Sequence, residues 1–467
     1  MSSSSDFLRS HAIVIGGGMA GLLAAHVLTR YFERVSLIER DVYPEGPLFR
    51  PGTPQARHVH IMLVRGQQIL EKLFPGIKDK LVAQGALEGD FVADYNYYFP
   101  SSGWVPRMPS SLKGYVCTRP LLEWQVRQEV MARQRVQVIE KYEVINLLAS
   151  SDKRVVTGVR IRARTHEALA EREILQLEAD LVVDTSGRDS QFPFWLESLG
   201  YAPPSETVIN PFFGYSSRLY IPPHHFARTW KGLVVQANPP KNLRGGVTWP
   251  IEGGKWMVVL GGTGKDYPPN DEGGFLEFVK SISTPLFYEA LKDAQPCSPI
   301  YGYRNTENRL RHLERLTRQP EGFVALGDSV CAFNPVYGQG MTTAALGATA
   351  LDESIRQHGQ NGLEGLPHRF QRKLAKINAT PWQLATASDY HVPGIEGMNP
   401  NLLERLTYRY VDKIVEVLPC APSVSKTFSH VLHMVEPPTA LFRPRIAAQV
   451  LLHSFSRGKS HPIDAPF

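Results

Sequence analysis

A glycine-rich turn close to the N-terminus is the feature that most constrains the fold of this chain. Residues 12–15 form an apolar, β-branched run that is typical of a strand buried in a parallel sheet. Residues 16–21 read GGGMAG and match G-x-G-x-x-G, and a helical run follows over residues 22–31. A strand, a glycine-rich turn and a helix in this order predict a doubly wound α/β unit that binds a dinucleotide at the turn.

Each glycine of this motif has a physical task. Gly16 permits the tight turn out of the strand, Gly18 lets a pyrophosphate approach the backbone, and Gly21 lets the helix pack close to the sheet. Residues 35–38 predict a second strand that ends in Glu39, where a carboxylate can bind the ribose hydroxyls of an adenosine. Because that carboxylate would repel a 2′-phosphate, the site favours FAD or NAD over NADP.

A second glycine-bearing segment lies far along the chain. Residues 322–326 predict another buried strand, and residues 334–345 (NPVYGQGMTTAA) predict a loop that opens a helix. Backbone N–H groups at such a helix start can face an anion, and a reduced flavin carries negative charge at its N1 and C2=O positions. Asp328, between the strand and the loop, can hold a ribityl hydroxyl. A nicotinamide enzyme has no evident need for this second site, so the pair of segments predicts FAD.

Together these segments resemble the para-hydroxybenzoate hydroxylase superfamily of FAD-dependent monooxygenases, over most of the chain. Residues 54–60 (PQARHVH), 65–66 (RG), 117–123 (CTRPLLE) and 335–341 (PVYGQGM) resemble one branch, the bacterial flavin epoxidases and hydroxylases that act on natural-product skeletons. The sequence departs at residues 182–188 (VVDTSGR), where the middle motif of the superfamily usually begins Asp-Gly. This variant resembles those of halogenases and isoprenoid reductases. The resemblance therefore does not assign the motif its usual nicotinamide-side role.

The resemblance implies a set of cofactor-binding residues. In it, Arg57 and Arg119 lie along the flavin and the pyrophosphate, and the backbone of Val144, on a strand expected over residues 138–144, meets the adenine. Gly340 and Met341 donate N–H groups to a flavin carbonyl. The full set is Gly16, Gly18, Met19, Ala20, Gly21, Glu39, Arg40, Arg57, Arg119, Val144, Asp328, Gly338, Gln339, Gly340 and Met341.

Aromatic residues crowd two other segments, residues 91–99 and residues 212–260. Their alternation and their Gly/Pro turns predict antiparallel strands, with a hairpin turn at residues 253–254. Most single aromatics are expected in the core of this sheet, while one face of it is expected to line an apolar substrate cavity over the flavin. The candidate substrate contacts are Tyr97, Phe213, Tyr215, Trp249, Pro335 and Tyr337.

The predicted fold class is α/β, with a Rossmann-like FAD-binding domain interleaved with an antiparallel β-sheet substrate domain and followed by a C-terminal helical region. The FAD-binding domain is expected over residues 1–75, 110–200 and 300–355. The substrate domain takes residues 76–109 and 201–299, and the helical region takes residues 356–467. The apolar run at residues 446–452 suggests a closing helix, which, with Arg443, Arg445 and Arg457 nearby, could also contact a membrane surface or a substrate within it.

Composition and charge narrow the location and the partners. The net charge of +6, without a basic run, does not indicate nucleic acid. The four cysteines lie far apart and indicate reduced thiols. Residues 1–10 lack a secretory apolar region and no run of ~18 apolar residues occurs, so a cytoplasmic protein without a transmembrane segment is expected. His58 and His60 have no clustered third ligand, so no metal site is expected.

The resemblance implies the chemistry. NADH or NADPH reduces the flavin, O2 is captured as the flavin C4a-hydroperoxide, and one oxygen atom passes to an apolar, natural-product-like substrate of secondary metabolism. An alkene substrate would be epoxidised without an acid or base on the protein, whereas hydroxylation of a phenol would require a base near its hydroxyl. The sequence assigns no catalytic side chain, substrate, oligomeric state or choice between direct reduction and a separate flavin reductase.

Three other functions stay open at this point. The first is a flavin-dependent reductase or dehydrogenase of prenyl-type substrates. The second is a flavin halogenase, although residues 247–251 (VTWPI) lack the first Trp of the halogenase motif W-x-W-x-I-P. The third is an FAD-binding redox sensor without catalytic activity.

Overall fold

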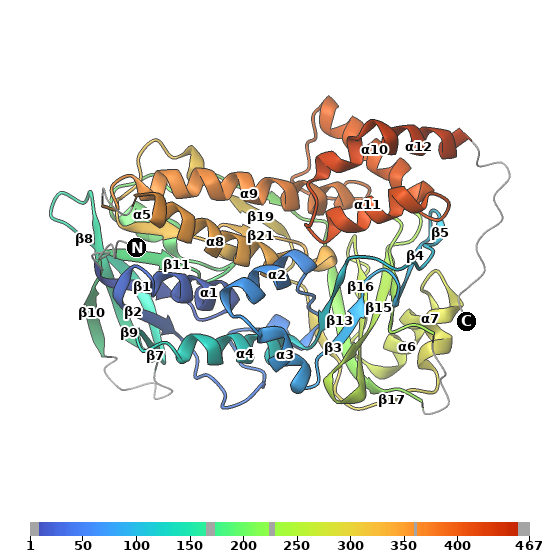
Figure 1. The fold of residues 1–467 in the computed structure, drawn as a ribbon, viewed down its shortest axis with the longest axis horizontal. Helices are drawn as coiled ribbons and strands as arrows, with labels where there is room; N and C mark the ends of the chain where they lie inside the picture. The colour runs from blue at the N-terminus through green and yellow to red at the C-terminus, as the bar shows by residue number, and fades with distance from the viewer. Residues whose placement is uncertain (1–8, 165–172, 224–228, 359–361, 456–467) are drawn as a thin grey trace, which may run out of the picture.

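The computed structural model describes residues 9–164, 173–223, 229–358 and 362–455 (Figure 1). Arg457, named above beside the C-terminal apolar run, lies outside these residues. A parallel sheet with its helices occupies one half of the molecule and a larger sheet occupies the other, with the last helices stacked above the larger sheet in the view of Figure 1.

The strand, turn and helix expected at the N-terminus begin a parallel sheet. Its strand order is β20-β11-β1-β2-β7, and every pair is parallel. The sheet is assembled from segments far apart in the sequence, which is the topology of a doubly wound α/β unit. The strands are β1 (Arg9–Ile15), β2 (Phe32–Glu39), β7 (Val136–Glu140), β11 (Leu181–Asp184) and β20 (Phe323–Ala325).

Helices bury the apolar faces of this sheet. The first glycine turn leads into α1 (Met19–Leu28), which packs against α4 (Arg119–Met131) and α8 (Gly340–His358). Nearly every residue of α1 is buried, because the helix lies between the sheet and these neighbours. The shorter helices of this half are α2 (Val64–Leu73), α3 (Ile77–Ala83) and α5 (Phe192–Ser198).

The larger sheet has the strand order β17-β13-β16-β15-β14-β4-β5, with β18 paired to β13. The hairpin expected at residues 253–254 joins β15 to β16, and both glycines have a positive φ. One pair departs from the antiparallel prediction, because β4 arrives from a distant segment and lies parallel to β14. The strands are β4 (Tyr95–Phe99), β5 (Gly103–Trp104), β13 (Gly214–Ile221), β14 (Gly232–Val235), β15 (Arg244–Ile251), β16 (Lys255–Gly262), β17 (Gln295–Pro296) and β18 (Tyr301–Tyr303).

Helices α6 (Glu272–Lys280) and α7 (Pro285–Leu291) pack against each other and supply Phe275, Phe278 and Phe287 to the core of the larger sheet. Other aromatic side chains, among them Trp256 on β16 and Trp230 just before β14, complete this core. Most aromatic side chains of these segments therefore lie in the core of the sheet, as expected from the sequence.

Three smaller sheets complete the fold. The strand expected over residues 138–144 is two strands, because Lys141 adopts a positive φ and breaks the run between β7 and β8. Val144 consequently lies on β8, in an antiparallel sheet with β9 and β10. The strands of these sheets are β3 (Leu87–Asp90), β6 (Lys113–Val116), β8 (Tyr142–Ala149), β9 (Val156–Ala163), β10 (Ile174–Glu178), β12 (Glu206–Ile209), β19 (Asn308–Arg311) and β21 (Cys331–Ala332).

Helix α9 (Leu366–Asp389) links the parallel-sheet half to the C-terminal helices. Its first half packs on α8 and adds Phe370 and Leu374 to the core of the parallel sheet. Its second half adds Leu384 to the separate core of α10 (Leu402–Val417), α11 (Pro422–Leu432) and α12 (Pro444–Phe455). The helical region proposed to start at residue 356 therefore begins inside α8, and much of α9 shares a core with the parallel sheet.

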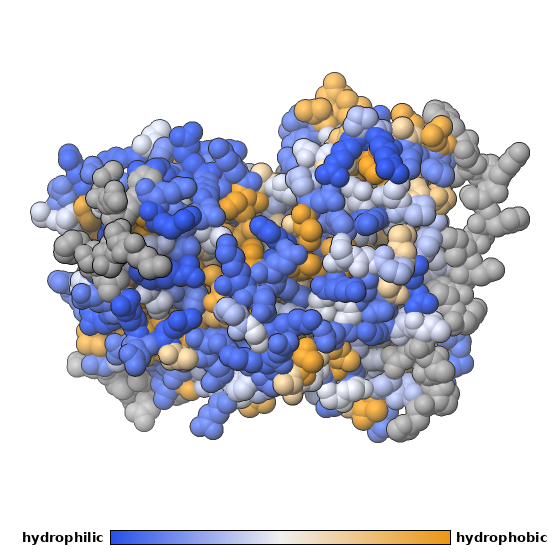
Figure 2. All heavy atoms as spheres, viewed as in Figure 1, coloured by the Kyte–Doolittle hydropathy of each residue, from blue (hydrophilic) through white to orange (hydrophobic). Residues whose placement is uncertain are grey.

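Large apolar side chains are exposed on the C-terminal helices. Leu402 and Leu403 on α10 and Leu451 and Leu452 on α12 are all more than half exposed. Figure 2 shows hydrophobic residues at the upper edge of the molecule, over α10 and α12. Among the described residues, no helix combines the length and the apolar character that crossing a membrane requires.

Candidate functional site

A cavity of about 500 Å³ lies at the carboxyl ends of β1 and β2. It extends from the first glycine turn to the turn at residues 334–340 that precedes α8, and it reaches Tyr215 and Tyr303 on the larger sheet. In open α/β sheets, ligands bind at the carboxyl ends of the strands. The two glycine-bearing segments of the sequence therefore line one cavity.

Most of the expected cofactor-binding residues line this cavity. Gly21 and Arg57 do not. The guanidinium of Arg57 instead stacks on the rings of Phe49 and Tyr301, at 4.7 and 4.5 Å from their centroids. The lining residues of the expected set are Gly16, Gly18, Met19, Ala20, Glu39, Arg40, Arg119, Val144, Asp328, Gly338, Gln339, Gly340 and Met341.

The glycines of the first turn differ in what surrounds them. A Cβ on Gly21 would lie 1.8 Å from the carbonyl oxygen of Gly16, so Gly21 is required for helix packing rather than for contact with a ligand. A Cβ on Gly18 would meet no protein atom within 4 Å. Gly18 therefore faces open cavity, which leaves room for a phosphate group against the backbone at the start of α1.

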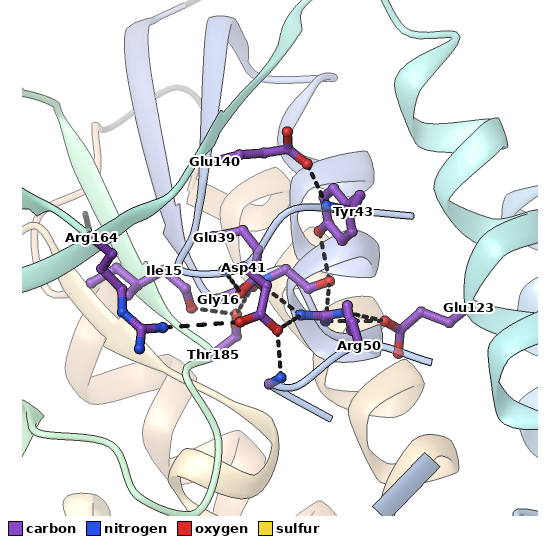
Figure 3. A network of polar contacts seen from close by, with 12 residues as sticks. Ile15, Gly16, Glu39, Asp41, Tyr43, Arg50, Glu123, Glu140, Arg164 and Thr185 are labelled. Carbon is purple, nitrogen blue, oxygen red and sulfur yellow. Dashed lines mark hydrogen bonds and ion pairs between the residues drawn. The ribbon is translucent and has the colours of Figure 1, made fainter. Parts of the chain in front are cut away.

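Glu39 is held rigidly at the end of β2. Its Oε2 accepts a hydrogen bond of 2.8 Å from the backbone N–H of Gly17, and its Oε1 accepts one of 3.0 Å from the N–H of Asp41. The guanidinium of Arg50 lies 3.1 Å from Oε2 (Figure 3). A carboxylate has about four lone-pair sites, so Glu39 keeps capacity for a hydroxyl donor from the cavity.

Arg50 is a site residue that the sequence does not reveal. It lies in the loop after β2 and is buried among three carboxylates, those of Glu39, Asp41 and Glu123, at 3.1 to 3.2 Å (Figure 3). It also donates to the carbonyl of Gly17, at 3.2 Å. Burial opposes the charge of Arg50, but Glu123 and Glu39 outweigh burial and raise its pKa. Arg50 therefore links the first glycine turn and Glu39 to helix α4.

The divergent middle motif supports the first glycine turn. The hydroxyl of Thr185 donates to the carbonyls of Ile15 and Gly16, at 2.7 and 2.9 Å (Figure 3). Asp184 is fully buried and accepts hydrogen bonds of 2.6 Å from the hydroxyls of Ser186 and Ser190. In this chain the motif at residues 182–188 therefore contributes the hydroxyl of Thr185, which holds the first glycine turn through its backbone carbonyls.

The second glycine turn presents polar groups to the cavity. The side chain of Asn334 accepts from the N–H of Val336 and caps a short 3-10 turn, η5 (Pro335–Tyr337). Gly338 follows with a φ of 64° and leads to Gln339 and the start of α8. The amide nitrogen and oxygen of Gln339 are buried and have no partner among the described residues. The side-chain amide of Gln339 can therefore form hydrogen bonds with a ligand in the cavity.

Asp328 lies on the same side of the cavity. A Cβ on Gly340 would stand 3.7 Å from its Oδ1, which places the carboxylate beside the start of α8. Burial raises the pKa of Asp328, and the guanidinium groups of Arg188 and Arg119 offset only part of that rise. Asp328 lines the cavity, and its contact with a ribityl hydroxyl stays a prediction.

Of the candidate substrate contacts, Tyr215 and Pro335 line the cavity. Trp249 lies in the sheet core, stacked on Tyr95 with ring centroids 4.5 Å apart, and Tyr97 packs in the same core. Phe213 and Tyr337 also lie outside the cavity lining. Phe213 packs on Tyr215, with centroids 5.7 Å apart, and the hydroxyl of Tyr337 bonds to Ser388. Alternation along a strand does not show which face meets the cavity, so the sequence could not separate these residues.

Two histidines approach this end of the cavity in their neutral form. His58 bonds through Nδ1 to the hydroxyl of Ser217, at 2.7 Å, and its ring meets the edge of Tyr215. His60 lines the cavity and bonds through Nδ1 to the carbonyl of His58, at 3.1 Å. Burial lowers the pKa of each histidine to about 3, and nearby cationic groups add to the effect. Because a carbonyl only accepts, Nδ1 of His60 carries the proton and Nε2 is left as an acceptor.

Among the described residues, no group of three His, Cys, Asp or Glu side chains is arranged to bind a metal ion. An FAD molecule does fit the donors and acceptors that line the cavity. Glu39 suits a ribose, the open space at Gly18 suits a pyrophosphate, and the unpaired amide of Gln339 suits the polar edge of a flavin.

Comparison with known proteins gives one relative of substantial identity. Over 82% of its length the chain is 32% identical to Protein Rv3254 of Mycobacterium tuberculosis, of which the alignment covers 80%. It is 24% identical to a kynurenine 3-monooxygenase of Salinispora tropica, over 75% of this chain and 73% of that protein. No family model matches the sequence.

Solved structures share the fold at low identity. The flavin-dependent brominase Bmp2 superposes with a TM-score of 0.66 at 14% identity, over 96% of this chain and all of that one. PqsL of Pseudomonas aeruginosa, described as a probable FAD-dependent monooxygenase, gives a TM-score of 0.61 at 13% identity, over 83% of this chain and 97% of that one. These likenesses extend the shared architecture over both halves of the molecule.

Proposed function

The chain belongs to the superfamily of FAD-dependent monooxygenases, and from this premise we propose that it transfers one oxygen atom of O2 to an apolar small-molecule substrate, by epoxidation or hydroxylation. The observation that carries the proposal is the single cavity that joins the two glycine turns to the aromatic side chains of the larger sheet. A cofactor bound between the turns would place its reactive end beside those aromatics.

The chain supplies binding, orientation and charge at this site. Bound FAD would supply the redox chemistry that activates O2. Glu39 and Gly18 would hold the adenosine and pyrophosphate, and Asp328 would hold the ribityl chain. The backbone N–H groups of Gly340 and Met341 begin a helix of 19 residues, and their partial positive charge would stabilise negative charge at that end of the cavity.

Apolar side chains in the cavity wall support an apolar substrate. Val59, Ile61 and Phe333 line the cavity together with Tyr215 and Tyr303, and Arg188 lies in the same wall. The neutral imidazole of His60 adds an acceptor without adding a charge. Such a wall would also exclude water, which protects a reactive oxidant from wasteful breakdown. We infer a natural-product-like alkene or phenol as the substrate class.

Electrons for the reaction would come from NADH or NADPH, either directly or through a separate flavin reductase. The four cysteines are unpaired in the structure, which suits a reducing compartment such as the cytoplasm.

The decisive experiment follows the oxygen atom. The FAD-loaded protein would be given NADH or NADPH and a panel of apolar alkenes and phenols, under ¹⁸O-labelled O2, and the products examined by mass spectrometry. The proposal expects substrate-stimulated oxidation of the nicotinamide and a labelled oxygen in the product. A product formed at full rate under argon would identify a reductase or dehydrogenase, and a product that requires added halide would identify a halogenase. FAD binding without any substrate-stimulated oxidation would favour a redox sensor.

A further inference from the structure

A buried carboxylate outside the cavity supports the second glycine turn. Asp389, the last residue of α9, is only 4% exposed. Its Oδ2 accepts a hydrogen bond of 2.7 Å from the side-chain amide of Asn308 on β19, and its Oδ1 accepts one of 3.0 Å from the amide of Asn334. Both asparagines are themselves buried.

The orientation of both amides is set by the backbone of the turn. The side-chain oxygen of Asn308 accepts from the N–H of Asn334, at 2.7 Å. The side-chain oxygen of Asn334 accepts from the N–H of Val336, at 3.3 Å. Each amide therefore turns its NH2 group toward Asp389. A partner that satisfies two such donors must accept twice, which an ionised carboxylate does.

This triad of Asn308, Asn334 and Asp389 leads directly to the cavity. Asn334 lines the cavity and caps η5, and Gln339 and Gly340 follow within six residues. A second contact joins the same two elements, because the hydroxyl of Tyr337 bonds to Ser388. The end of α9 is thereby fastened to the turn through both of its last residues.

We propose that Asp389 is a positioning residue: its ionised carboxylate holds the turn at residues 334–339 in the shape that receives the flavin, and protonation of Asp389 loosens that shape. The proposal rests on the proposed function, because it takes the ligand of this turn to be FAD. It adds a pH-dependent step to flavin binding that involves no contact between Asp389 and the ligand.

The surroundings of Asp389 place this step near neutral pH. Burial raises its pKa to about 7, and the two amide hydrogen bonds lower it in part. Tyr337 faces it from the turn, and its own pKa is raised by burial and, to a smaller extent, by Asp389. The other charges nearby have partners of their own. His391 pairs with Asp412 of α10 at 3.0 Å, and Arg309, next to Asn308, pairs with Glu307 at 3.2 Å.

Protonation has a definite structural consequence. A neutral acid offers one carbonyl oxygen and one O–H group. The carbonyl oxygen can still accept from one amide, but the O–H group meets the NH2 group of the other, donor against donor. Since the backbone fixes both amides, neither can turn to accept. One of the two hydrogen bonds is lost, and a buried donor is left unsatisfied.

Two variants separate this role from general stability. Asp389→Asn imitates the protonated acid, because an amide also presents one acceptor and one donor. In the double variant Asn308→Asp/Asp389→Asn, the carboxylate moves to residue 308. There it accepts from the N–H of Asn334 and from the new side-chain amide at residue 389, whose oxygen accepts from the amide of Asn334. Every donor and acceptor is again paired.

The test measures the dissociation constant of FAD by flavin fluorescence, for each protein at about pH 6 and about pH 8.5. The wild type is expected to bind FAD about tenfold more tightly at the higher pH, the equivalent of about one hydrogen bond. Asp389→Asn is expected to bind at the weaker level at both pH values. The double variant is expected to recover most of the wild-type affinity at the higher pH. Circular dichroism shows that each variant is folded.

Three results would overturn the proposal. They are a wild-type affinity that does not change with pH, an Asp389→Asn variant whose affinity falls below that of the wild type by the same factor at both pH values, and a double variant that binds FAD no better than Asp389→Asn. The failure of the proposed function looks different, because a protein that never binds FAD gives no dissociation constant at any pH. A protein that binds FAD independently of pH refutes only the role of Asp389.

Discussion

At the scale of single residues, Gly18 and Gly21 of the first glycine turn have different predicted functions and different surroundings. Gly18 faces open space, whereas Gly21 is pressed against the carbonyl of Gly16. A side chain at residue 18 would therefore occupy ligand volume, and a side chain at residue 21 would displace backbone. The two positions are expected to respond differently to substitution.

Gly18→Val is expected to leave the fold intact and to abolish flavin binding. The new side chain enters the space that a pyrophosphate would take, so the affinity for FAD should fall about a hundredfold or more, about 2.7 kcal/mol. Equilibrium dialysis with FAD measures the affinity, and a thermal melt of the flavin-free protein measures the fold.

The matched control is Gly46→Val, because Gly46 also meets no atom within 4 Å but lies outside the cavity. It should bind FAD normally. Gly21→Ala should instead lower the melting temperature of the flavin-free protein, because its methyl group meets backbone. Unchanged FAD affinity in Gly18→Val would refute the placement of the pyrophosphate.

Arg50 permits a second prediction at this scale. Arg50→Met removes the cation from among Glu39, Asp41 and Glu123, and unpaired buried carboxylates are costly. The free energy of unfolding should fall by about 3 to 5 kcal/mol at neutral pH. Urea unfolding of the flavin-free protein at about pH 7 measures the loss.

Arg164→Met serves as the control for Arg50→Met. Arg164 also approaches Asp41, but at 4.0 Å and with nearly half of its side chain exposed. A pair of this kind contributes at most about 1 kcal/mol. If the two arginine variants lost equal stability, the network around Arg50 would not have the importance assigned to it.

At the scale of elements, the structure shows why some of the site could be predicted from sequence and some could not. Glu39 and the first glycine turn are contiguous with the strand and helix that position them, so a local pattern identifies them. Arg50 and His60 lie in irregular loops and enter the cavity through long-range packing. The strand expected over residues 138–144 was wrong because a single positive φ at Lys141 divides it, and local hydrophobicity carries no sign of that break.

The junction of α9 with η5 makes a prediction about stability that is separate from flavin binding. Because the pKa of Asp389 is raised to about 7 in the folded protein, the fold takes up a proton that the unfolded chain has released. Its contribution is therefore fully present below the ordinary carboxyl pKa and is lost as the pH rises through about 7. Protonation of Asp389 therefore stabilises the folded state against unfolding, although it removes a hydrogen bond that shapes the turn.

Urea unfolding of the flavin-free protein tests this sign. Between about pH 5 and about pH 8, the free energy of unfolding of the wild type should fall relative to that of Asp389→Asn, which has no proton to lose at residue 389. A difference between the two proteins that stays constant, or that grows in favour of the wild type as the pH rises, would show that Asp389 titrates below this range.

At the scale of the whole molecule, the fold class could be predicted because each half has its own local pattern, glycine turns in one and alternating aromatics in the other. Which aromatics meet the cavity depends on how the two halves dock. Tyr215 reaches it, while Trp249, two strands away, is buried against Tyr95. The same docking brings Tyr303, which no motif marks, into the cavity wall.

The sequence leaves open a contact of the C-terminal region with a membrane surface, and the exposed residues of α12 are the ones to test. Within the run at residues 446–452, Ile446 and Val450 are buried, while Leu451 and Leu452 are exposed close to Arg445 in the sequence. Leu451→Glu/Leu452→Glu should reduce sedimentation of the protein with anionic lipid vesicles several-fold. Equal sedimentation of the wild type and the variant would refute a role of α12 in such contact.

The most direct test of the whole account is the flavin content of the protein itself. The purified chain, incubated with excess FAD and separated from free FAD by gel filtration, is expected to stay yellow, with one flavin per chain and a visible spectrum shifted from that of free FAD. The Gly18→Val variant, treated in the same way, is expected to emerge colourless. A folded wild-type protein that retains no flavin would contradict the assignment of the cavity and everything inferred from it.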